Sequence, residues 1–358
     1  MEAVSPVKPV RNASIDLMRL PAALLVVLNH TGLFLDVNTT LGHYVSTFLP
    51  RFTLPFFLAV SGYYFVGNLL DGRMPLKRNL LAIVKPYLLW SLLYYLASFV
   101  VNVVMGSEPL GKFLVDRVIY LFTSGSYFQL WYFPALIYSM IIVNGVFRLL
   151  GRRGLNGLTV LSFVLLVVGI LGSAYVELGR HIPVLSQLYA WSGFGTLRGI
   201  FLMGLPYFLM GHVLRLWKEG HEPRMGLLTG LLVGAVALYF GEMTLLIHLN
   251  WVERPEVMVS TYWLTLTVFA MLLRCPLPQY GRQAQWCNLQ SGFVYFVHGL
   301  VLIAAKQGAA AMGLPLGTLP LTVLVIVVSM LLGQVCLWWR NPFTGMLLGK
   351  GGTTRAQA

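Results

Sequence analysis

The sequence has little charge. Of its 358 residues only 10% are Asp, Glu, Lys or Arg, whereas 57% are apolar. Soluble domains carry about one quarter charged residues, so this composition excludes an ordinary soluble protein, and the mean hydropathy of +0.75 agrees. We therefore expect an all-α membrane protein with no room for a separate soluble domain.

Cysteine is also scarce. The three cysteines, Cys275, Cys287 and Cys336, share no close spacing. This argues against a disulfide framework and against a zinc site, and we expect no metal. The net charge of +13 is not gathered into one basic stripe, and no nucleic-acid-binding motif accompanies it. We therefore expect no nucleic-acid partner.

Long apolar runs dominate what is present. A window of about 20 residues, the length that crosses the hydrocarbon core, predicts ten spans in one bundle at residues 15–340. The bundle follows an N-terminal segment at 1–14 and precedes a tail at 341–358. The first run lacks a signal-peptide cleavage site, so we expect it to be retained as a span. The spans are predicted near 15–35, 48–69, 80–105, 127–148, 155–175, 196–216, 225–247, 258–274, 289–310 and 317–339.

The basic residues predict the orientation. A cytoplasmic N-terminus places 18 of them on the cytoplasmic side and six outside, and it leaves Arg198 within a span. Such a bias in short loops is the usual topology signal of membrane proteins. We therefore expect both termini in the cytoplasm, and we interpret most loop cations as insertion signals.

The first apolar run carries ionisable residues, which are costly at membrane depth and usually functional. Asp16 and Arg19 are three residues apart and can pair on one helix. His30 follows Arg19 by eleven residues, which returns to nearly the same helical face about 16 Å further along. A neutral imidazole at that depth suits general-base chemistry.

Four other polar residues fall within predicted spans. We interpret His298 either as a hydrogen-bonded packing residue or as part of a cavity. Ser61 beside Gly62 indicates a small polar patch, which in spans usually means close helix packing. Arg198 and Glu242 both fall inside or near the outer ends of their spans and can be partners.

Five segments together resemble the acyltransferase-3 family of multi-span membrane enzymes. The spacing of Arg19 and His30 resembles the basic-x10-His signature that opens this family. In the last segment Gly299 stands where the family often has proline after the histidine. The resemblance covers about 14–340, and its other segments are Pro55–Tyr63, Leu130–Leu136, Pro206–Gly211 and Val294–His298.

The resemblance implies an O-acyltransferase in a bacterial inner membrane. It would transfer an acetyl or other short acyl group from cytoplasmic acyl-CoA, usually acetyl-CoA, to a hydroxyl of a sugar or cell-envelope glycan. His30 would be the catalytic residue, as general base or as carrier of the acyl group. We assign acyl-CoA binding to Arg19, Asp16, Arg78 and Arg152, and the substrate cavity to Ser61, Trp131, Arg198 and His298.

Two other functions stay open from the sequence. A transporter or flippase for a glycan or lipid-linked sugar would use His30 and Asp16 as a proton relay, since ionisable groups at the midplane suit carriers as well. No inverted repeat or paired broken spans are evident, which favours the enzyme. A non-catalytic scaffold would explain the spans but not the polar residues within them.

Overall fold

A computed structural model describes residues 12–73, 76–219, 224–253 and 255–339, with the single positions 345 and 347. Almost all of the predicted segments 1–14 and 341–358 lie outside the described residues. Every regular element within the described ranges is helical, so the protein is all-α as predicted. The α-helices are α1 (Ala13–Thr31), α2 (Thr39–Gly42), α3 (Thr53–Leu70), α4 (Leu76–Phe99), α5 (Leu110–Phe122), α6 (Tyr132–Leu171), α7 (Val176–Gly179), α8 (Pro183–Ala190), α9 (Phe194–Leu197), α10 (Leu205–Glu219), α11 (Met225–His248), α12 (Val259–Arg274), α13 (Gly281–Ala311) and α14 (Thr318–Trp338).

Irregular helical turns join several of these helices. The π-helices are η1 (His43–Phe48), η3 (Val100–Val104) and η4 (Arg198–Gly204), and the 3-10 helices are η2 (Leu49–Phe52) and η5 (Pro278–Tyr280). 3-10 turns are common connectors, whereas π-helical turns are rare and often occur at functional sites. Two of these segments, η2 and η4, carry the arginines Arg51 and Arg198.

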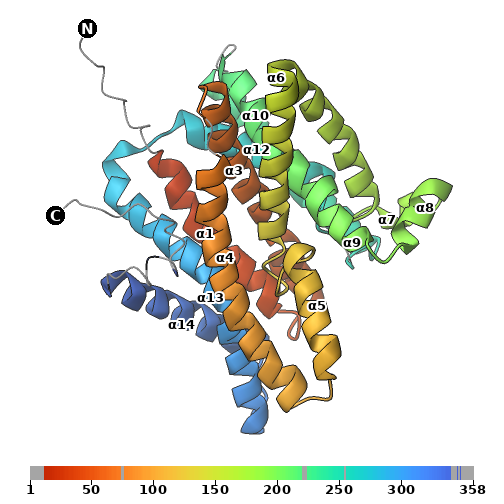
Figure 1. The fold of residues 1–358 in the computed structure, drawn as a ribbon, viewed down its shortest axis with the longest axis vertical. Coiled ribbons are helices and arrows are strands. Elements are labelled where there is room, and N and C mark those ends of the chain that lie inside the picture. The colour runs from red at the N-terminus through yellow and green to blue at the C-terminus, as the bar shows by residue number, and fades with distance from the viewer. Residues whose placement is uncertain are drawn as a thin grey trace.

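Eight helical stretches in the described part of the chain are long and apolar enough to cross a membrane. The difference from ten predicted spans has two causes. The spans 127–148 and 155–175 both fall in the 40-residue α6, which reverses direction at Gly151 (φ 61°, ψ −151°), and Figure 1 shows its two halves running in opposite directions. The span 258–274 is α12, whose 16 residues are fewer than the usual 20. The number of crossings and the side of the termini stay predictions.

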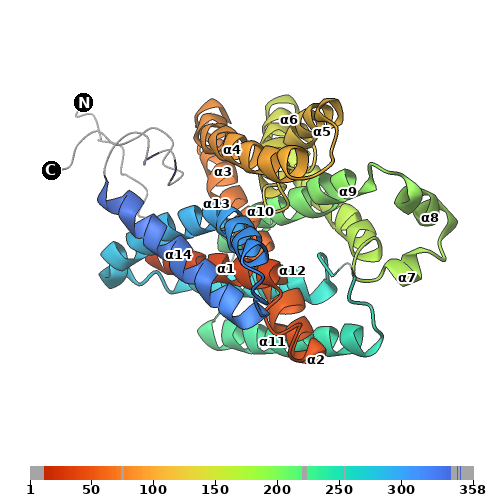
Figure 2. The same ribbon diagram turned by 90° about the horizontal axis from the view of Figure 1, so that it is seen from below.

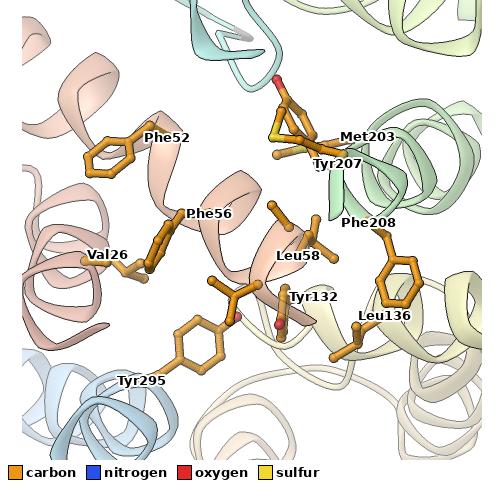
Figure 3. Packing of buried hydrophobic residues seen from close by; sticks show 14 of the residues in the cluster. Val26, Phe52, Phe56, Leu58, Tyr132, Leu136, Met203, Tyr207, Phe208 and Tyr295 are labelled. Atoms are coloured by element: carbon orange, nitrogen blue, oxygen red, sulfur yellow. The ribbon is translucent and has the colours of Figure 1, made fainter. Parts of the chain in front are cut away.

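The core lies where α1, α3, α6, α10 and α13 meet (Figure 3). Figure 2 shows α14 along the outside of this group and α7 and α8 projecting from it. Glycines let α3 and α10 approach closely: a Cβ on Gly62 would lie 1.8 Å from the Phe208 carbonyl oxygen, and one on Gly211 would lie 2.1 Å from the Tyr63 nitrogen. The predicted close packing at the Ser61–Gly62 patch is confirmed.

Candidate active site

A cavity of about 480 Å³ lies at one end of the bundle. Its walls come from the end of α1, the turn η2 with the start of α3, the loop 123–131, the start of η4, the loop before α12 and the middle of α13. Small-molecule sites usually enclose about 300–1,000 Å³. Successive helices run in opposite directions, so the end of α1, the start of α3 and the loops before α6 and α12 lie on the same side of the bundle. The charge pattern predicts that this side is the outer face.

His30 is the penultimate residue of α1 and lines this cavity. Its ring centroid lies 4.3 Å from that of Phe128 and 5.4 Å from that of His298. The Asn29 side-chain nitrogen is 3.5 Å from Nδ1 of His30, too long to fix which ring nitrogen carries the proton. The imidazole is therefore held by neighbouring rings and presented to an open space.

His298 stacks on His30 with an angle of 18° between the rings. It is fully buried, and its Nδ1 lies 3.0 Å from the Val294 carbonyl oxygen, to which it donates. Its Nε2 has no hydrogen-bond partner within the described ranges. Buried polar atoms usually have a hydrogen-bond partner, so the unpaired Nε2 of His298 is an exception. It belongs to the ring that stacks on His30.

Asp16 and Arg19 lie at the other end of α1, outside the cavity lining. Arg19 Nε is 3.4 Å from Asp16 Oδ1, so the predicted pair is confirmed. Arg19 Nη1 donates to Asn288 Oδ1 on α13 at 2.6 Å. The Arg19 side chain is 28% exposed and that of Asp16 only 6%. The carboxylate thus orients a guanidinium that keeps an accessible edge.

The other predicted site residues divide into two groups. Trp131 and Arg198 line the cavity with His30. Ser61 and His298 do not, contrary to the expectation. His298 is buried against the His30 ring. The Ser61 hydroxyl donates to the Phe57 carbonyl at 2.9 Å and lies 3.4 Å from the Tyr132 hydroxyl. Arg78 and Arg152 are exposed, in the first turn of α4 and directly after the reversal of α6 respectively, and neither lines the cavity.

The expected pairing of Arg198 with Glu242 is wrong. Arg198 Nη1 lies 3.4 Å from Glu256 Oε2. Glu242 instead accepts hydrogen bonds from the Tyr175 hydroxyl at 2.8 Å and from the backbone N–H groups of Val259 and Ser260 at 3.0 and 2.7 Å. The first N–H groups of a helix have no partner within it, and Glu242 satisfies two of them at the start of α12.

The cavity residues that were not found from the sequence include Asn29, Arg51 and Glu256. Asn29 precedes His30 in an apolar run, which is a usable signal. Arg51 counted only as an outer loop cation. Glu256 belongs to a loop between predicted spans, and no local pattern connects it to η4.

The described residues contain no cluster of three His, Cys, Asp or Glu side chains that could hold a metal ion. The three cysteines are free thiols. The described residues that line the cavity supply one imidazole, two guanidiniums and one carboxylate together with aromatic walls, and the His298 imidazole packs behind His30.

Comparison with known proteins gives one family and several partial relatives. A family model described as an acyltransferase domain, acyltransferase-3, matches residues 12–338. An amino-acid racemase of Enterococcus faecalis is 32% identical over 56% of this chain and 28% of its own length. A serine/alanine racemase of Enterococcus gallinarum is 28% identical over 58% of this chain and 30% of its own length. The matches thus span less than a third of each relative, and no solved structure matches significantly.

Proposed function

This chain belongs to the acyltransferase-3 family, and from that premise we propose that it is a multi-pass membrane O-acyltransferase with His30 as its base. The donor would be a cytoplasmic acyl-CoA, acetyl-CoA above all. The acceptor would be a hydroxyl of a sugar or cell-envelope glycan, and the location the inner membrane of a bacterium.

The observation that supports this most directly is the placement of His30. Its ring lines the cavity and contacts His298 and Phe128. A nearby second imidazole disfavours the charged form of the first, so the pair favours a neutral His30 able to accept a proton. A general base must reach the proton it removes, and an acceptor hydroxyl in this cavity meets that condition.

The proposed reaction transfers the acyl group directly. His30 takes the proton as the acceptor oxygen attacks the thioester carbonyl, so that a C–O bond forms and the C–S bond breaks. The departing thiolate then receives the proton as free CoA. In the other route His30 itself carries the acyl group before the hydroxyl attacks it.

The donor would approach from the end of α1 opposite the cavity. Arg19 would contact the acyl-CoA phosphates, because guanidinium groups bind phosphate oxygens in pairs. Asp16 would orient Arg19, as their 3.4 Å contact and the different exposure of the two side chains suggest. Arg78 and Arg152, both exposed, would add positive charge. The thioester must then extend about 16 Å along α1 to His30.

The test is acyl transfer by the purified chain. Labelled acetyl-CoA is supplied with a panel of hydroxyl acceptors, and release of CoA and label in the acceptor are both measured. The panel includes serine because one partial relative is a serine/alanine racemase. His30→Ala should abolish transfer and Arg19→Ala should raise the KM for acetyl-CoA. The matched control is His181→Ala, at an exposed position outside the cavity. Undiminished transfer by His30→Ala would refute the proposal.

A transporter or flippase is the second candidate, because His30 lines the cavity and stacks on the buried His298, so that two ionisable groups lie next to each other beside it. Protein reconstituted in liposomes distinguishes the two functions. Proton-coupled flux of a sugar or lipid-linked sugar without consumption of acetyl-CoA would establish the carrier. Acceptor-dependent release of CoA would establish the enzyme.

A further inference from the structure

Among the described residues, three charged side chains line the cavity together with the His30 imidazole: Arg51, Arg198 and Glu256. They come from η2, from η4 and from the loop before α12, so only the fold brings them together. Two are positive and one is negative. The described wall of the cavity therefore carries an excess positive charge.

Glu256 is already committed to other groups. Its Oε2 lies 3.4 Å from Arg198 Nη1 and accepts a hydrogen bond from the Ser173 hydroxyl at 3.1 Å. The same Ser173 oxygen accepts the backbone N–H of Val257 at 3.0 Å. These contacts fix the Glu256 carboxylate against Arg198, so one of the two positive charges is compensated.

Among the described residues of the cavity wall, Arg51 is the cation without an ion-pair contact. Its Nε donates to the Thr47 carbonyl at 2.6 Å, which anchors the guanidinium. Its two terminal nitrogens make no hydrogen bond within the described part of the chain. It shares the cavity wall with His30 and Glu256. An anchored guanidinium with a free outer edge matches the two oxygens of one carboxylate or phosphate.

We propose that Arg51 binds a carboxylate group on the acceptor and so places a hydroxyl of the same molecule at His30. A singly charged carboxylate balances the one excess positive charge. A phosphate with two charges would face the nearby Glu256 and is therefore disfavoured. The inference rests on the proposed function because it names the class of acceptor, a hydroxyl compound with one carboxylate.

The experiment compares three matched acceptors: D-glucuronate, D-glucose and D-glucose 6-phosphate. Transfer from acetyl-CoA is measured for the wild type, Arg51→Gln, Arg51→Lys and the control Arg180→Gln. Arg180 is exposed and pairs with Glu177 outside the cavity. Binding without chemistry is measured as the shift in Tm when the His30→Ala protein and its Arg51→Gln double variant are titrated with each compound.

We expect glucuronate to bind and react in preference to the other two. Charge-assisted hydrogen bonds imply that Arg51→Gln raises the KM for glucuronate about 10- to 100-fold with little change in kcat. Arg51→Lys should be intermediate because it keeps the charge and loses the paired donors, and Arg180→Gln should match the wild type.

The outcomes separate the two proposals. Two results would overturn the carboxylate site. In the first, glucose and glucuronate bind and react equally, or neither binds. In the second, the Arg51→Gln variant binds glucuronate as tightly as the protein without that substitution. Transfer to glucose in that case leaves the acyltransferase proposal standing. Arg51-dependent binding of glucuronate without any transfer supports the carboxylate site and refutes the acyltransferase proposal.

Discussion

Gly62→Ala should destabilise the protein by forcing α3 away from α10. The new Cβ would lie 1.8 Å from the Phe208 carbonyl oxygen, whereas real Cβ contacts are not shorter than 3.0 Å. Because the obstructing atom belongs to the backbone, no side-chain rotation relieves the clash, and the two helices must separate by more than 1 Å. Overpacking costs about 1–3 kcal/mol, while replacing a helical glycine by alanine gains up to about 1 kcal/mol. We expect a net loss of about 1–2 kcal/mol.

The matched control is Gly234→Ala in the middle of α11, an exposed position where a Cβ would have no neighbour within 4 Å. It retains the gain in helix propensity and lacks the clash, so its Tm should equal or exceed that of the wild type. Thermal unfolding in detergent would be followed for the two variants and the wild type together.

Acyl transfer provides a second measurement for Gly62→Ala. The start of α3 supplies the cavity-lining residues Thr53 and Leu54, so a displaced α3 should also lower transfer. A Gly62→Ala protein that melts at or above the wild-type temperature would show that the backbones of α3 and α10 do not approach as closely as described.

Three further predictions concern other residues of the described fold. His298→Leu should lower transfer at least tenfold and shift its pH profile without lowering Tm, because it removes a buried nitrogen that has no partner; unchanged kinetics would leave His298 as packing alone. Glu242→Ala should lower the free energy of unfolding by about 1–3 kcal/mol, because it leaves the first N–H groups of α12 unpaired. It should also raise the acceptor KM, because the loop that carries Glu256 adjoins these groups. A Tm equal to that of the wild type would contradict the prediction. Hydrogen bonds from Thr318 hold the pKa of Asp36 below its usual 3.8, so the stability that the ionised Asp36 adds is present above pH 3.8 and is lost as the pH falls through the lower folded value. The Tm difference between wild type and Asp36→Asn should therefore shrink below pH 3.8, and a difference independent of pH would refute that role.

The sequence by itself determined the class of the protein. Long apolar runs and scarce charge leave only membrane-spanning helices, because a backbone in lipid must satisfy its own hydrogen bonds. The Asp16–Arg19 pair and the close packing at Gly62 were also predictable, since both depend on spacing along one helix or on residue size. The five short segments between Arg19 and His298 together indicated the family, which the family match confirms.

Only the tertiary structure decided which charges share the cavity with His30. Arg198 meets Glu256, not Glu242, because the loop before α12 folds against the start of η4, and Glu242 is held by the unpaired N–H groups of α12. Arg51 belongs to the cavity because an irregular turn at η2 places it there. The Arg198–Glu256 contact joins positions more than 50 residues apart, so the partner of Arg198 depends on how the helices pack, which no local pattern records.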